Sequence, residues 1–174
     1  MARIPYADCK NEAVRPLADR IVAERGDILH LYQMLMHSAP LAEGWLNYLT
    51  AVRQKTALSG ALRELIIMRV ALLNNAPYEA DQHAPIALRE GVSQAKLDAL
   101  NDWPSCALFD AQEQAVLAYT DAMTRQIQVP DAVFAAVNAL HSPQQMVEIT
   151  ATVAAYNMVS RFLEAFQIHS HDAR

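Results

Sequence analysis

The residue types best suited to chemistry gather in one short segment near the middle of the chain. Glu79 and His83 are four residues apart, which places them one turn from each other on the same face of a helix. A carboxylate there can hold the imidazole in one tautomer and raise its pKa toward neutrality, as a general acid or base requires. Tyr78 precedes them, and its phenol can donate a hydrogen bond to an oxyanion. The spacing therefore predicts proton chemistry.

A further carboxylate, Glu64, lies upstream in a strongly apolar segment. Ten of the thirteen residues in 61–73 are apolar, which is typical of a buried helix. The residues one turn from Glu64 are non-polar, so burial is expected to raise its pKa unless a cation or hydrogen-bond donors compensate. Arg63 and Arg69 do not share its helical face. We therefore expect any compensating arginine to come from a distant part of the chain.

The last predicted helix, 142–168, offers a candidate for that arginine. It is mostly apolar but carries a polar stripe that includes Asn157, Ser160 and Arg161. The stripe is either the solvent-facing edge of the helix or part of a site. In the second case Arg161 is the cation that faces Glu64 or a substrate carboxylate.

The elements that position these residues are predicted to be helices only. Apolar residues recur with helical spacing throughout, and the alternation typical of strands is nowhere sustained. The expected fold is an all-α, single-domain helical bundle over residues 1–174, with its core at about 27–168. The predicted helices span residues 11–25, 28–36, 40–54, 61–75, 77–91, 93–100, 110–128, 130–140 and 142–168.

Several local signals set the predicted helix ends. Asp27 and Asn75 are plausible N-terminal caps, and Gly91 is a C-terminal cap. Two capping boxes are expected, one beginning at Asp110 and one at Ser142.

Composition narrows the classes of partner. The chain is 53% hydrophobic with a net charge of −5, which argues against nucleic acid and anionic membrane as partners. The apolar excess favours a homo-oligomer with a buried interface. No apolar run reaches membrane-spanning length, and the N-terminal residues lack the apolar region of a secretory signal. Cys9 and Cys106 lie far apart, so we expect no disulfide and a cytoplasmic setting.

A resemblance to a known family rests on three pieces of the sequence. They are the helix at 62–73 with its R-E-L, the segment APYEADQH at 76–83 followed by Ala87 and Gly91, and the late YNMVSRFLEAFQI. Together they resemble the carboxymuconolactone decarboxylase family, which has the alkylhydroperoxidase D-like fold. The resemblance implies a small helical subunit in a dimer, trimer or hexamer, with neither a metal nor an organic cofactor.

The peroxidase-like branch of this family uses a glutamate, a C-x-x-C pair and a histidine. Glu64 and His83 match the glutamate and the histidine, whereas the two cysteine positions fall on Ala76 and Glu79. A dithiol peroxidase needs a thiolate and a resolving thiol, so the sequence disfavours that activity.

The decarboxylase branch does not depend on the cysteines. Resemblance to it implies a lyase, or a related acid/base enzyme, whose partner is a small carboxylated lactone or organic acid. His83 is then the proton-transfer residue, oriented by Glu79, and Glu64 is a supporting acid. The expected site residues are His83, Glu79, Glu64 and Tyr78 for catalysis, and Arg161 and Asn157 for substrate binding.

Two other functions fit the same residues. In a non-catalytic oligomeric binding protein, Glu64 and His83 would only join helices or subunits. In a metal protein, Glu64, Glu79 and His83 would surround one ion, but no second histidine lies nearby in the sequence, and we expect no metal.

Overall fold

Residues 1–172, the part of the chain that the structure describes, form nine α-helices and one 3-10 helix, with no strand, in the computed structural model. The elements are α1 (Arg15–Arg25), α2 (His30–Leu35), α3 (Ala39–Gln54), α4 (Gly60–Leu73), α5 (Pro77–Arg89), α6 (Gln94–Ala99), η1 (Leu100–Ser105), α7 (Ala111–Gln126), α8 (Asp131–Asn138) and α9 (Pro143–Phe166). The all-α fold predicted from the sequence is confirmed.

Helix ends follow local chemistry where the signal is contained in a few adjacent residues. Both predicted capping boxes form, with the side chains of Asp110 and Ser142 each accepting a bond from the third backbone N–H of the helix. Gly91 adopts the left-handed conformation (φ +99°) just beyond α5, as a C-terminal cap requires.

Two predicted N-terminal caps are wrong. Asn75 is itself left-handed (φ 51°), and Ala76 holds the cap position of α5. Asp27 accepts a bond from the N–H of Ile28, and α2 begins later, with Leu29 at its cap position.

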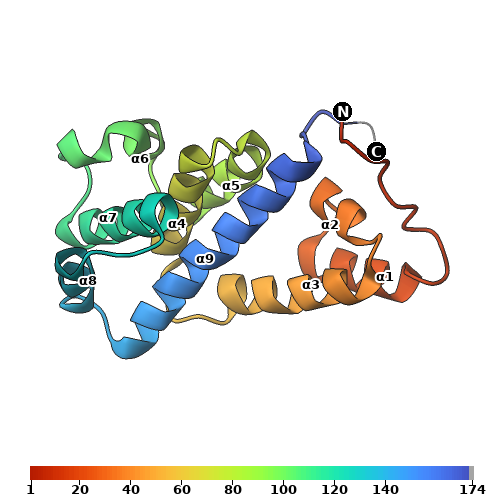
Figure 1. The fold of residues 1–174 in the computed structure, drawn as a ribbon, viewed down its shortest axis with the longest axis horizontal. Coiled ribbons are helices and arrows are strands. Elements are labelled where there is room, and N and C mark those ends of the chain that lie inside the picture. Colours follow the sequence, from red (N-terminus) through yellow and green to blue (C-terminus); the bar gives the residue numbers. More distant parts are fainter. Residues whose placement is uncertain (173–174) are drawn as a thin grey trace.

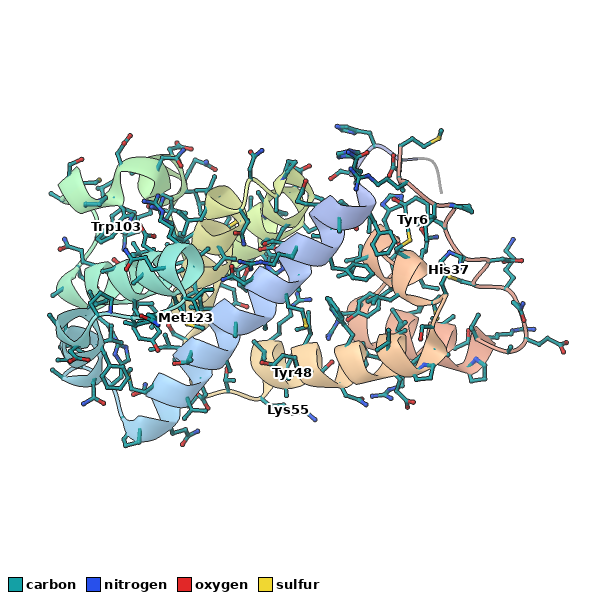
Figure 2. All side chains as sticks on the ribbon, viewed as in Figure 1. Tyr6, His37, Tyr48, Lys55, Trp103 and Met123 are labelled. Carbon is teal, nitrogen blue, oxygen red and sulfur yellow. The ribbon has the colours of Figure 1, made fainter. Side chains whose placement is uncertain are left out.

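The longest helix, α9, divides the molecule. Figure 1 shows it crossing diagonally, with α4–α8 on one side and α1–α3 on the other. Figure 2 shows the side chains on both groups, with Trp103 near α6 in one group and Tyr6 beside α2 in the other. Helix α4 packs against α5, α7 and α9 and is buried along most of its length, as its apolar sequence predicts.

Polar side chains also tie α4 to its neighbours. Arg69 binds both oxygens of Asp121 on α7, at 2.6 and 2.7 Å, and donates to the carbonyl of Leu100. Such a bidentate, partly buried ion pair fixes the relative placement of two helices. This arginine of α4 is therefore structural. Within residues 1–172, no helix is long and apolar enough to cross a membrane.

Candidate active site

Two adjoining cavities lie where α2, α3, α5 and α9 meet. The lining of the inner cavity is Leu29, Leu31, Tyr32, Leu49, Arg53, Tyr78, Glu79, Gln82, His83, Tyr156, Val159 and Leu163. The outer cavity is lined by Glu24, Arg25, Leu29, Arg53, Gln54, Gln82, His83, Pro85, Ile86 and Arg89. Because Arg53 and His83 belong to both linings, they stand where the two spaces join.

His83 is held by a carboxylate from the neighbouring helix. Its Nδ1 lies 2.7 Å from Oε2 of Glu64, whose side chain is fully buried in α4. The ring of His83 meets that of Tyr156 at right angles, with 5.0 Å between the ring centres. A carboxylate only accepts, so Nδ1 carries the hydrogen and Nε2 keeps its lone pair. The hydrogen bond that the described residues make to the ring uses Nδ1 and leaves Nε2 without a partner among residues 1–172, and His83 lines both cavities.

The charges around this pair favour an ionised carboxylate and a neutral ring. Burial raises the pKa of Glu64, but the bond to His83, the charge that this ring carries when protonated, and the charges of Arg63 and Arg53 outweigh it, so the net pKa is lowered. Burial, together with the charges of Arg53 and Arg63, lowers the pKa of His83 despite the bond to Glu64 and the charge of that carboxylate. At neutral pH the pair is therefore carboxylate and neutral imidazole.

The expected origin of the compensating arginine is corrected by the structure. The Nε of Arg63, the residue next to Glu64, lies 3.3 Å from Glu64 Oε1. The prediction considered helical faces only, whereas a long arginine side chain can fold back toward its sequence neighbour.

The predicted pairing of Glu79 with His83 is also wrong. The Oε2 of Glu79 accepts a bond of 2.9 Å from the hydroxyl of Ser160 on α9, while Glu64 takes the place at the imidazole. Glu79 is 2% exposed, and its Oε1 has no hydrogen-bond partner within residues 1–172. Burial, with a smaller contribution from Glu164, raises the pKa of Glu79 to about 8 despite the Ser160 bond. Glu79 is thus a neutral carboxylic acid at pH 7.

This protonation gives a stability prediction for Glu79→Gln. Folded Glu79 keeps a proton that the unfolded chain loses above about pH 4.5, so wild-type stability falls as pH rises toward 8. The slope is at most about 1.4 kcal/mol per pH unit. Denaturant unfolding should therefore show Glu79→Gln gaining stability over wild type between about pH 5 and about pH 8. Glu43→Gln, at an exposed carboxylate, is the control. A difference that does not change with pH would contradict the assignment.

Two residues predicted to bind substrate lie elsewhere. Arg161 is exposed and donates to the backbone and side-chain oxygens of Asn157, at 3.0 and 2.6 Å. The Nδ2 of Asn157 bonds the hydroxyl of Thr124 on α7, so this stripe joins helices. Neither Arg161 nor Asn157 lines the inner or the outer cavity. Tyr78, by contrast, lines the inner cavity, and its ring meets that of His30 at a centroid distance of 6.0 Å.

Among the cavity residues that the sequence did not reveal, Arg53 and Tyr156 lie beside His83. Arg53 lines both cavities, and within residues 1–172 no carboxylate forms an ion pair with its guanidinium. It sits near the end of an amphipathic helix, where nothing local distinguishes it from a surface arginine. Tyr156 lies within the late segment YNMV that supports the family resemblance, but its apolar ring resembles ordinary core.

The cysteines and possible metal ligands of the chain do not add to this site. Cys9 and Cys106 are both free and partly buried, and neither lines the two cavities. No group of three or more histidine, cysteine or acidic side chains within residues 1–172 has a metal-binding arrangement. The cavity therefore presents acid, base and cation without a thiol.

Comparison with known proteins shows a family match for the segment that carries the site. Residues 39–122, which include Glu64, Glu79 and His83, match the model of the carboxymuconolactone decarboxylase family. The uncharacterized protein YnjA of Escherichia coli is 30% identical over 127 residues, covering 72% of this chain and 66% of YnjA.

Solved structures show the same fold at low identity. A peroxidase-related protein from Ralstonia eutropha JMP134, described as an alkylhydroperoxidase AhpD core, gives a TM-score of 0.83 at 16% identity, covering 98% of this chain and 93% of its own. A point variant of the debrominase Bmp8, in complex with 2,3,4-tribromopyrrole, gives a TM-score of 0.80 at 18% identity. This match covers 95% of the present chain and 90% of the Bmp8 chain. Residues 39–122 of the chain match the carboxymuconolactone decarboxylase family, and the chain has the AhpD-like fold.

Proposed function

We propose that the protein is a decarboxylase-like lyase acting on a small carboxylated lactone or related organic acid. The observation that carries this proposal is the pairing, in one cavity, of a protonated carboxylic acid, Glu79, with an imidazole whose Nε2 is free, His83. Groups whose environments push their protonation in opposite directions are the mark of acid/base chemistry. The match of residues 39–122 to the carboxymuconolactone decarboxylase family supports decarboxylation as the proposed reaction class.

The reaction needs a proton donor. The bond between a substrate carbon and its carboxylate breaks, CO₂ leaves, and the bonding electron pair passes into the conjugated lactone carbonyl. The Glu79 carboxylic acid then gives its proton to carbon, forming the new C–H bond and leaving a carboxylate. Each CO₂ released consumes one proton, so Glu79 has to be reprotonated before the next turnover.

His83 is the route for that proton. Glu79 lines only the inner cavity and is almost completely buried, whereas His83 lines both cavities. A proton arriving at Nε2 from the outer cavity makes an imidazolium, which the Glu64 carboxylate stabilises at Nδ1. Because the pKa of His83 is lowered and that of Glu79 is raised to about 8, the transfer from His83 to Glu79 is downhill.

Arginines give the site its preference for anions. Arg53 stands at the junction of the cavities without an ion-pair partner within residues 1–172, and Arg25 and Arg89 line the outer cavity. These three arginines outnumber Glu24, the carboxylate in the lining of the outer cavity, so the local charge attracts an anionic substrate even though the whole chain carries a net charge of −5. Apolar side chains of the inner cavity, such as Leu49 and Val159, suit the uncharged body of a small molecule.

The test is CO₂ release from a panel of small lactone acids, measured across pH. The value of kcat/KM should fall above about pH 8, where Glu79 loses its proton, and Glu79→Gln should lose most activity at every pH. In D₂O the product should carry one deuterium on carbon. Absence of CO₂ release throughout the panel, or a Glu79→Gln protein as active as wild type, would sink the proposal.

The thiol peroxidase alternative has less support. The two positions that carry cysteines in the peroxidase-like branch are Ala76 and Glu79, and both are buried. The chain's own thiols lie outside the cavity, and the pKa of Cys9 is raised by burial and by Asp8, which disfavours its thiolate.

A further inference from the structure

Behind the cavity, Arg63 touches the acid–base pair without reaching the substrate space. Its side chain is 11% exposed and belongs to neither cavity lining. Its Nε lies 3.3 Å from Oε1 of Glu64, and its Nη2 lies 3.4 Å from Oε1 of Glu90 at the end of α5. We infer that Arg63 is a positioning residue that keeps Glu64 ionised and the His83 ring neutral with its proton on Nδ1.

The two oxygens of Glu64 have different partners, and this division supports the inference. Oε2 accepts from His83, and Oε1 accepts from Arg63. A fully buried carboxylate with no cation beside it would take up a proton or draw one onto the imidazole. Arg63 supplies that positive charge, so neither the Glu64 carboxylate nor the His83 imidazole has to take up an additional proton. The proton then stays on Nδ1, and Nε2 remains a lone pair at the cavity.

Other charged groups face His83, but within residues 1–172 Arg63 is the arginine that forms an ion pair with Glu64. Arg53 approaches from α3, Tyr156 from α9, and Glu79 lies on the same helix as His83. Arg53 lines the cavity, so a bound anion neutralises its charge there. Glu79 is protonated, and burial raises the pKa of Tyr156 far above neutrality. Arg63 lies outside the cavity, and its charge therefore persists when the substrate binds.

The consequence for the reaction rests on the proposed function. A neutral resting ring lets His83 accept a proton from the outer cavity and pass it to Glu79. Without Arg63 the imidazole would hold its proton more tightly, and the downhill step from His83 to Glu79 would shrink or reverse.

The test is the NMR titration of the His83 ring in the full chain, without substrate. The chain has six histidines, and the His83 signal is assigned by its loss in His83→Gln. In Arg63→Met the midpoint should rise by about one pH unit or more, whereas Arg63→Lys, which keeps the charge, should stay much closer to wild type. Arg161→Met is the matched control, since it removes an arginine that is exposed and outside both cavities. If Arg63→Met does not fold, Arg63→Gln serves as the neutral variant.

The outcomes separate this inference from the proposed function. A midpoint that rises in the neutral Arg63 variant but not in Arg63→Lys or Arg161→Met supports it, because a merely structural role would not follow charge. A folded neutral variant with the wild-type midpoint overturns it and leaves the proposed function standing. Inactivity of wild type on every lactone acid would overturn the proposed function while leaving the titration result intact.

Discussion

His83→Gln is expected to lower steady-state CO₂ release about 10²- to 10⁴-fold. Glutamine keeps a donor for the buried Glu64 carboxylate but cannot carry a proton between the cavities. Glu79 is still protonated when substrate arrives, so the first round of CO₂ release should survive. Rapid-quench measurement should therefore show one CO₂ per site followed by a very slow phase.

The matched control for this experiment is His141→Gln. His141 is as buried as His83, at 7% exposed, and it is hydrogen bonded at both ring nitrogens, but it lies outside the two cavities. Its replacement tests the cost of removing a buried histidine as such. Turnover by His83→Gln at the rate of the His141 control would show that protons do not pass through His83.

Arg53→Met is expected to raise KM about 30- to 100-fold, with a smaller change in kcat. Among the cavity residues that the structure describes, Arg53 is the one cation that lines both spaces, so it is placed to meet the substrate's anionic group. Loss of such a charged contact costs about 2–3 kcal/mol of binding free energy. Steady-state kinetics on the best lactone acid of the panel measures the change.

Arg161→Met provides the contrast for Arg53→Met. The sequence offered Arg161 as one candidate for the carboxylate clamp, with a solvent-facing position as the alternative, and the structure places it on the exposed side of α9, bonded to Asn157. Its replacement should leave KM near the wild-type value. A large KM increase for Arg161→Met, together with none for Arg53→Met, would show that Arg161 on α9, and not Arg53, binds the substrate carboxylate.

Features set by adjacent residues were predictable from the sequence. The capping boxes at Asp110 and Ser142 involve partners three residues away, and the turn at Gly91 needs only its own backbone freedom. The burial of Glu64 was also predictable, because its own helix is apolar nearly all round. These cases share one property, which is that the deciding contacts lie within a single helix.

Contacts between helices were harder to predict. The spacing of Glu79 and His83 is correct for a hydrogen-bonded pair on one helix. The packing of α4 against α5 nevertheless brings Glu64, instead of Glu79, within hydrogen-bond distance of the imidazole. Arg53 carries no local mark of its position, because only the packing of α3 beside α5 and α9 creates the cavity. The homo-oligomer, the organic-acid partner and the cytoplasmic setting stay predictions.

The first-turnover burst of CO₂ tests most directly whether this cavity performs proton chemistry without a thiol. The measurement compares the cysteine-free protein, with Cys9→Ser and Cys106→Ser, to Glu79→Gln in the same rapid-quench assay. We predict one CO₂ per site from the cysteine-free protein at the wild-type rate, and no burst from Glu79→Gln. A burst that disappears with the cysteines and persists in Glu79→Gln would contradict the account.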